Sequence, residues 1–387
     1  MALDPSSRTP PRRHAALEYR LPLALRLIRG LLMALVATAV LCVAYTGYWF
    51  YVASAFRDGL PAWIERMAGG GATLAYRQLE ISGYPFQFRL IFHEPLLDAP
   101  TLPALADKPL RWRANRVVAM MSPWNFRHYT IELNGDHRID WPAERGVRTT
   151  ALSAAEFVVT TDLHEDGLPQ SARFDLANLR IADGTISDGS LWTLGRGRVA
   201  ARRFFPEGEA ADKPTLAVEF RLDEVRLPPA DLPLGRDLAR LVGEARVVGV
   251  LANPLATEEL TRWRDAGGIL EFTLGEGRYG PLAINASGTA ALDDALQPML
   301  AGTAKVEGLF AAIDALRDRD MIRSRDAAMA KVMLGVLSRP GERGGAPTIS
   351  LPFSIQGQKL FAGPVPLMDV PPIEWPKPRD TRPRFLR

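Results

Sequence analysis

The sequence Ala217-Val218-Glu219-Phe220-Arg221-Leu222 alternates apolar with polar side chains, and this pattern decides the fold. Successive side chains of a β-strand point to opposite faces, so such a run separates its apolar side chains from its polar ones. The same alternation recurs at residues 84–90, 173–176, 179–181 and 270–274. Turn-forming glycine, aspartate and asparagine fall between runs, at residues 134–136, 182–184, 187–189 and 275–277. Short alternating runs separated by such turns predict antiparallel meanders.

A few segments show helical spacing instead. Leu232, Leu234, Leu238 and Leu241 predict a helix over residues 232–241, and a longer one over 309–337 ends at a Pro-Gly pair. A short helix within residues 53–75 ends at three successive glycines. These helices are too few to cover every strand. The predicted fold class is therefore mainly β (α+β), an elongated, curved and half-open antiparallel sheet with a few packed helices.

The apolar side chains of the alternating strands are the candidate site. An apolar groove would shield lipid acyl chains at about 0.8 kcal/mol per buried CH₂. If the same side chains instead close on one another, they form an ordinary core, and the protein would serve as a scaffold or interaction module. Both alternatives stay open at this point. The candidates for a lipid groove are Phe86, Phe88, Leu90, Phe174, Leu176, Val218, Phe220, Leu222, Leu270, Phe272 and Leu274.

An uncharged apolar stretch precedes the β-rich part, at residues 31–52 (LLMALVATAVLCVAYTGYWFYV). A helix of about 20 apolar residues crosses roughly 30 Å of hydrocarbon, so this stretch predicts a transmembrane anchor. Six arginines and two acids precede it, and positive flanks stay in the cytoplasm. The predicted parts are a cytoplasmic basic segment (1–30), the anchor (31–52), a periplasmic β-rich domain (53–370) and a proline-rich basic tail (371–387).

A cleaved signal peptide is the alternative to the anchor. Ala53-Ser54-Ala55 matches a small-residue cleavage site. However, the apolar region of a signal peptide has only about 7–15 residues, and this stretch is longer. Cys42, the sole cysteine, follows Val40-Leu41 rather than the small residue expected beside a lipidated cysteine. An uncleaved anchor is therefore the preferred interpretation.

Charge excludes one class of function. Residues 1–30 carry a net charge of +4 and residues 371–387 a net charge of +3, which leaves about −4 for residues 31–370. A nucleic-acid-binding domain needs a basic face, so no nucleic acid is expected as a partner. The single cysteine lies in the apolar stretch, and a disulfide-free body fits a bacterial periplasm better than a small secreted scaffold.

The sequence carries little that could perform chemistry. It contains no nucleophile-elbow, zinc-protease, P-loop or dinucleotide-binding motif. His128 and His137 flank the predicted turn at residues 134–136, where a hairpin could bring them together, but two histidines alone make an incomplete metal site. We therefore expect no enzyme activity, no catalytic residues, no metal and no cofactor.

A series of short segments resembles a known family. They are residues 82–86 (SGYPF), 263–268 (WRDAGG), 279–282 (YGPL), 288–293 (GTAALD), 351–353 (LPF), 357–361 (GQKLF) and 363–367 (GPVPL). Together and in this order they resemble domain-of-unknown-function family 2125 of Gram-negative bacteria. At the architectural level that family is similar to AsmA-like envelope proteins, which have one inner-membrane helix and a β-rich periplasmic body. The resemblance implies lipid handling or envelope maintenance, and supplies no catalytic residues.

The expected protein is thus a single-pass inner-membrane protein with its C-terminal body in the periplasm. Its expected partners are the membrane, phospholipid or acyl chains, and other envelope proteins. Lipid binding or envelope maintenance is the preferred function, with an envelope scaffold as the alternative.

Overall fold

The computed structural model describes residues 23–69, 71–102, 108–143, 146–184, 192–205, 213–228, 232, 234–251, 257–339, 347–373 and 375. The chain divides into two compact units, Met1–Ala55 and Phe56–Arg387. Each unit is described on its own.

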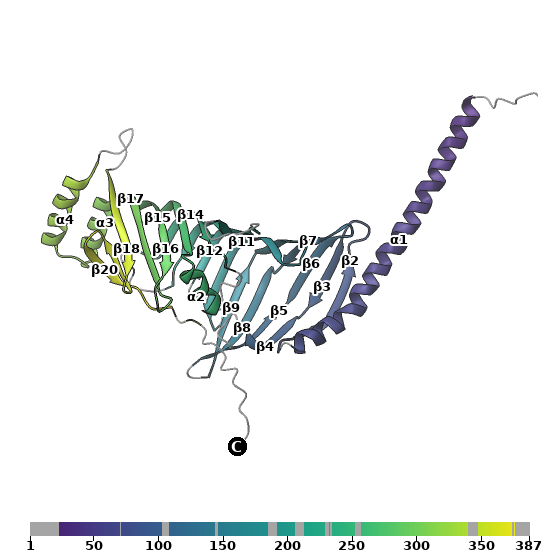
Figure 1. Ribbon diagram of the computed structural model, residues 1–387, viewed down its shortest axis with the longest axis horizontal. Helices are drawn as coiled ribbons and strands as arrows, with labels where there is room; N and C mark the ends of the chain where they lie inside the picture. The colour runs from purple at the N-terminus through teal and green to yellow at the C-terminus, as the bar shows by residue number, and fades with distance from the viewer. Residues whose placement is uncertain are drawn as a thin grey trace, which may run out of the picture. The chain divides into compact units, whose positions relative to one another are not determined.

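The first unit consists, in its described part, of the beginning of helix α1 (Leu23–Gly69). From Leu27 onward α1 is long and apolar enough to span a membrane. Most of its apolar side chains are exposed, with Leu31 and Val43 both at 74%. The predicted span at residues 31–52 lies wholly within this helix (Figure 1). The short helix predicted after the span is not separate, because α1 continues without a break to Gly69, the first of the predicted stop glycines.

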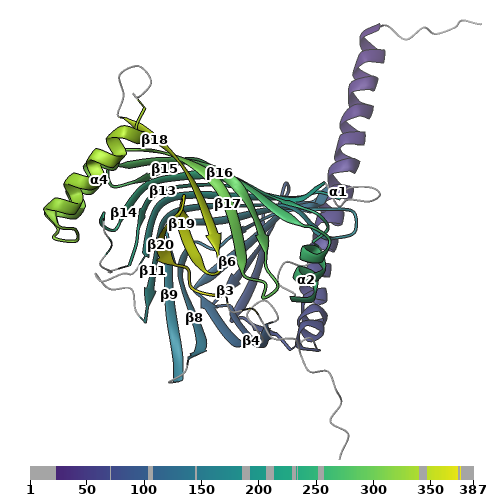
Figure 2. The same cartoon turned by 60° about the vertical axis from the view of Figure 1, so that its left-hand side comes forward.

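The second unit is built on an open, curved antiparallel sheet (Figures 1 and 2). This confirms the mainly β fold class. The strands are β1 (Thr73–Ala75), β2 (Gln78–Ser82), β3 (Phe88–His93), β4 (Leu96–Leu102), β5 (Lys108–Ala114), β6 (Arg116–Ser122), β7 (Asn125–Glu132), β8 (Gly135–Ala143), β9 (Gly146–Ala154), β10 (Glu156–Leu163), β11 (Pro169–Asp183), β12 (Trp192–Arg203), β13 (Pro214–Arg226), β14 (Asp237–Val248), β15 (Ile269–Tyr279), β16 (Leu282–Leu292), β17 (Pro298–Glu307), β18 (Thr348–Gln356), β19 (Lys359–Ala362) and β20 (Val365–Asp369).

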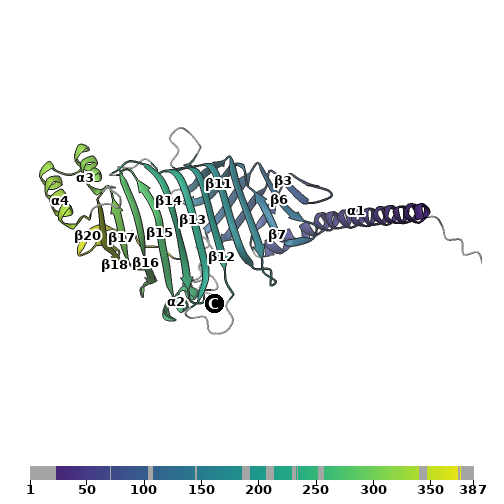
Figure 3. The ribbon, with the colours of Figure 1, turned by 90° about the horizontal axis from the view of Figure 1, so that it is seen from above.

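The early strands are halves of longer, kinked strands. Only one or two residues separate β3 from β4, β5 from β6, β7 from β8 and β9 from β10. One set of halves pairs in the order β2-β3-β6-β7-β10, and the other in the order β1-β4-β5-β8-β9. Both sets meet on the long strand β11. From β11 to β20 each strand pairs with the next, so β11 to β17 lie side by side (Figure 3).

The predicted turn at residues 134–136 is one of these kinks. Gly135 has the left-handed backbone that an Asn-Gly pair favours, with φ 101°. However, β7 and β8 pair with different neighbours instead of forming a hairpin. The predicted turn at residues 275–277 is likewise a bulge inside β15. In both cases glycine permits the backbone to bend. The pairing of the flanking strands determines whether the chain also reverses direction.

The helix predicted over residues 232–241 is wrong, because Leu238 and Leu241 belong to β14. A bulge between Leu238 and Arg240 inserts one extra residue, which puts both leucines on one face at a spacing of three. That spacing imitates helical periodicity.

The remaining helices also differ from the predictions. The segment 309–337 forms two helices, α3 (Leu309–Asp318) and α4 (Ser324–Leu337), with Asp320 between them at φ 56°. Helix α2 (Thr257–Asp265) was not predicted. The strand predicted at residues 84–90 begins only at Phe88. The turn at residues 187–189 and most of the tail, residues 374 and 376–387, lie outside the described residues.

Helices cover the sheet only locally. Near β3, Phe56 of α1 contacts Phe88 with ring centroids 5.5 Å apart, and Phe88 is fully buried. Along one edge, Trp263 of α2 is buried and donates a hydrogen bond from Nε1 to the Val248 carbonyl at 2.8 Å. Near β16, the buried face of α3 includes Ile313.

Candidate functional site

The candidate site is one continuous apolar face of the sheet, which we call the apolar face. Directly paired residues of neighbouring strands carry their side chains on the same face. One row of such pairs runs from β3 to β18 through Leu90, Ala119, Ile131, Val159, Phe174, Val199, Phe220, Gly243, Leu274, Ala286, Ala304 and Leu351. A parallel row from β3 to β19 runs through Phe88, Met121, Tyr129, Thr161, Ala172, Ala201, Val218, Ala245, Phe272, Gly288, Gly302, Phe353 and Ala362.

These rows place the predicted site residues. Leu176 and Leu222 flank Gly197 in a third row, and Leu270 pairs with Val247 on the same face. All the predicted residues except Phe86 therefore lie on the apolar face. Phe86 instead lies in the turn between β2 and β3, with its side chain 67% exposed.

The apolar face is only partly covered. Phe88 and Leu90 are buried at the β3 end, next to α1. In the middle of the sheet the same rows are half exposed, at Phe174, Leu176, Val218, Phe220, Leu222, Leu270, Phe272 and Leu274. A closed core would bury side chains of this size. The middle of the apolar face therefore has no complete second layer within the described part of the chain.

Aromatic rings on this face lie over glycines of the neighbouring strand. A Cβ added to Gly243 would lie 2.7 Å from Cζ of Phe220. One added to Gly288 would lie 2.9 Å from Cζ of Phe272. Gly302 and Phe353 repeat the arrangement, also at 2.9 Å. The rings therefore lie along the sheet, over the neighbouring strand, instead of standing up from it.

The rings also lean toward one another. Phe272 and Phe353 belong to strands three spacings apart, which is about 14 Å along a flat sheet. Their ring centroids are only 6.3 Å apart. This approach across Gly288 and Gly302 is the arrangement that a sheet curved toward its apolar face produces.

The opposite face of the sheet is polar, and ion pairs join neighbouring strands on it. Nε of Arg198 lies 2.6 Å from Oδ1 of Asp175, and Nε of Arg240 lies 2.7 Å from Oδ1 of Asp223. The Arg240 hydrogen bond holds the pKa of Asp223 below its ordinary value. A hydrogen bond from Arg278 does the same to the pKa of Glu276. These groups stay charged at neutral pH, so this face remains hydrated.

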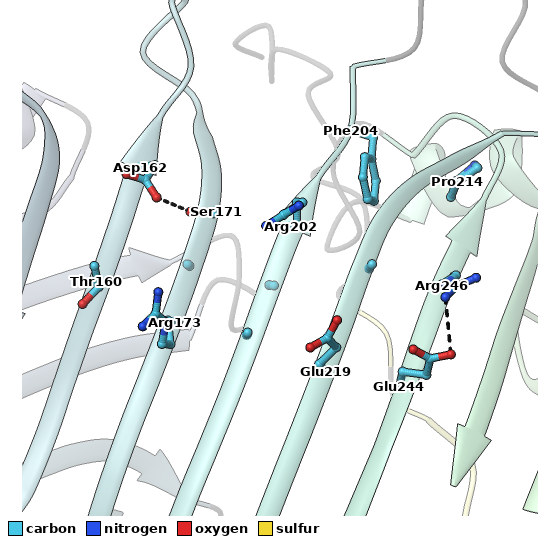
Figure 4. A pocket seen from close by; sticks show the side chains of 14 residues that line it. Thr160, Asp162, Ser171, Arg173, Arg202, Phe204, Pro214, Glu219, Glu244 and Arg246 are labelled. Atoms are coloured by element: carbon cyan, nitrogen blue, oxygen red, sulfur yellow. Dashed lines mark hydrogen bonds and ion pairs between the residues drawn. The ribbon is translucent and has the colours of Figure 1, made fainter. Parts of the chain in front are cut away.

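A shallow hollow of about 440 Å³ lies on the polar face (Figure 4). Its lining includes Arg173, Arg202, Glu219, Glu244 and Arg246, which come from β11 to β14. Glu219 and Glu244 are directly paired, and Nη2 of Arg246 lies 3.4 Å from Oε1 of Glu244. The charged side chains around it are largely exposed, Glu244 is paired with Arg246, and Asp162 accepts a hydrogen bond from Ser171. We assign it no chemistry.

The two histidines considered for a metal site point to opposite faces. His128 contacts Asp162, with Nδ1 2.7 Å from Oδ1. His137 is buried on the apolar side, stacked on Trp112, and its Nε2 donates to the Leu133 carbonyl at 2.6 Å. Among the described residues, no cluster of three or more His, Cys, Asp or Glu side chains could hold a metal ion.

Sequence reasoning missed two features. Glycines at the apolar positions of β14, β16 and β17 were a usable signal, because a glycine there leaves room for a neighbouring ring. The second feature is the exposed apolar side of α4, formed by Met329, Val332, Met333 and Val336 at 61–83% exposure. The exposure of these side chains depends on the way α4 packs, which the sequence does not show.

Comparison with known proteins yields one family. A family model described as "Uncharacterized protein conserved in bacteria (DUF2125)" matches residues 49–371. No curated protein and no solved structure is similar to this chain. The architectural likeness to AsmA-like proteins stays a prediction.

Proposed function

Since this chain belongs to the bacterial family DUF2125, whose description states no activity, we propose from its geometry that it is a membrane-anchored protein that holds lipid acyl chains on the apolar face. The observation that carries the proposal is the half-exposed middle of that face, where large side chains such as Phe220 and Phe272 remain accessible. Contact between water and exposed apolar side chains is unfavourable, and a bound acyl chain displaces that water.

The dimensions of the face suit this ligand. Strands β11 to β17 span six strand spacings, or about 29 Å. One leaflet of a bilayer is roughly 15 Å of hydrocarbon, so an acyl chain fits within that width. Covering the chain gains about 0.8 kcal/mol for each buried CH₂. The ion-paired polar face stays in water meanwhile, which keeps the loaded second unit hydrated outside the bilayer.

The test is photo-crosslinking in living cells with the full chain. Phe272→p-benzoylphenylalanine places a photoreactive ketone on the apolar face, and Thr273→p-benzoylphenylalanine places it on the exposed opposite face of the same strand. We expect lipid adducts, detected by mass spectrometry, at position 272 and none at position 273. Equal lipid labelling at the two positions, or none at either, contradicts the proposal.

An envelope scaffold is the second candidate function. It is supported by the exposed apolar side of α4, which a partner protein could cover. In the crosslinking experiment a scaffold gives no lipid adducts at position 272.

The proposed location is the bacterial inner membrane, with the second unit in the periplasm. This orientation is proposed because arginine is in excess before the span, and positively charged flanks stay in the cytoplasm. We expect alkaline phosphatase fused after Arg387 to be active, because that enzyme needs the oxidising periplasm for its disulfides. A cytoplasmic reporter that works at the same fusion point, beside an inactive phosphatase, would reverse this topology.

A further inference from the structure

Two neighbouring turns of the second unit present exposed aromatic side chains. The turn between β2 and β3 carries Tyr84 and Phe86, which are 48% and 67% exposed. The turn between β6 and β7 carries Trp124, which is 68% exposed, followed by Phe126 at 44%. The two turns are adjacent because β3 pairs with β6, with Phe88 opposite Met121. We call these four residues the aromatic tips.

The aromatic tips differ from other turns at the same edge of the sheet. Residues 82–87 (SGYPFQ) and 122–126 (SPWNF) contain no charged residue. By contrast, the turn between β10 and β11 contains Glu165 and Asp166, and the turn between β16 and β17 contains Asp293 and Asp294. Turns in water are usually polar, so two uncharged aromatic turns side by side need another environment.

The first of these turns is closed by a glycine with a left-handed backbone. Gly83 has φ +99°, and its carbonyl accepts a hydrogen bond from the Gln87 N–H at 2.9 Å. A Cβ at Gly83 would lie 2.7 Å from the Gln87 carbonyl oxygen. The close approach requires glycine and closes the turn tightly on either side of Tyr84 and Phe86.

The length of the chain places the aromatic tips near a bilayer. Phe126 contacts Phe56 of α1, with ring centroids 6.2 Å apart. Phe56 follows Val52, the last residue of the predicted span, by four residues. Four residues reach at most about 14 Å. This limit holds for every arrangement of the two units.

We propose that the aromatic tips insert into the interface of the membrane that holds the anchor, as a second membrane contact. Tryptophan and tyrosine favour the level of the lipid head groups, where an apolar ring meets a polar edge. Since Phe88, directly after the first turn, begins one row of the apolar face, this contact holds the β3 end of that face at the bilayer. That consequence rests on the proposed function, whereas the membrane contact itself does not.

The test uses the full chain with Cys42→Ser, which removes the sole native cysteine. Trp124→Cys or Phe86→Cys then carries an environment-sensitive NBD fluorophore, and the protein is reconstituted in phosphatidylcholine vesicles containing lipids with a nitroxide near the head group. We expect the fluorescence at both positions to shift to shorter wavelength and to be quenched by the nitroxide. Asp294→Cys, at an exposed turn between β16 and β17, is the matched control and should show neither change.

Each outcome either supports or overturns the proposed membrane contact of the aromatic tips. Absence of quenching at positions 86 and 124 overturns the inference, and so does equal quenching at position 294, which would mean unspecific adsorption of the body. Quenching at the aromatic tips without lipid adducts at Phe272 would leave the membrane contact standing and reject the proposed function. Lipid adducts at Phe272 without quenching at the aromatic tips would support the proposed function and reject the membrane contact.

Discussion

We expect Phe272→Asp to abolish lipid adducts on the apolar face while leaving the sheet folded. The side chain is half exposed, so a carboxylate there can reach water and need not be buried unpaired. A fixed charge on the apolar surface nevertheless repels an acyl chain. The measurement combines crosslinking from Phe220→p-benzoylphenylalanine, two strands away on β13, with circular dichroism of the purified full chain. Lipid adducts should disappear without loss of the β-sheet spectrum.

Two control variants separate the effect of the added charge from the effect of burying it. Thr273→Asp adds the same charge to the exposed polar face, and should change neither lipid capture nor folding. Phe88→Asp buries a carboxylate at a position with 0% exposure and should unfold the second unit. If Phe272→Asp unfolds the protein as Phe88→Asp does, the apolar face is a closed core, and the scaffold becomes the preferred function.

Gly308→Ala should lower the stability of the second unit by about 3 kcal/mol. Gly308 precedes α3 at φ 80°, where an L-residue costs about 1–2 kcal/mol. A Cβ there would also lie 2.0 Å from the Pro281 carbonyl oxygen, a backbone atom. Relieving that contact shifts α3 from the sheet, at a cost of about 1–3 kcal/mol. Thermal melting of the solubilised full chain should show a midpoint lower by roughly 5–10 °C.

Gly335→Ala is the matched control, because Gly335 lies inside α4 with open space where its Cβ would be. Alanine in a helix is more favourable than glycine by about 0.5–1 kcal/mol, so this variant should melt no lower than the parent. A Gly308→Ala protein that melts like the Gly335→Ala variant would show that α3 does not depend on the left-handed turn at Gly308.

The faces of the strands were predictable because a strand has a period of two. Glu271, Phe272 and Thr273 must alternate whatever strands pair with them. The same rule assigned Phe174, Phe220 and Leu274 to apolar faces. Prediction failed where a bulge changed the period. Leu238 and Leu241 have helical spacing in the sequence, although the extra residue between them, a bulge relative to β15, places both on one face of β14.

The site was predictable only as a set of side chains. Sequence spacing cannot say that Phe88 of β3 and Phe272 of β15 share one row of pairs, because pairing between distant strands depends on the order in which the whole chain folds back. Phe86 shows the opposite error. It continues the alternation of β3 in sequence, but the left-handed turn at Gly83 places it outside the strand.

The sequence by itself determined an apolar helix long enough to span a membrane and a β-rich body whose strands each have an apolar and a polar face. Both follow from local rules, since span length and side-chain alternation depend only on neighbouring residues. The tertiary structure alone decided which strands pair, that rings such as Phe272 lie over glycines such as Gly288, and that the middle of the apolar face stays half exposed. The exposure of a side chain depends on which other segments cover it, and those segments lie far away in the chain.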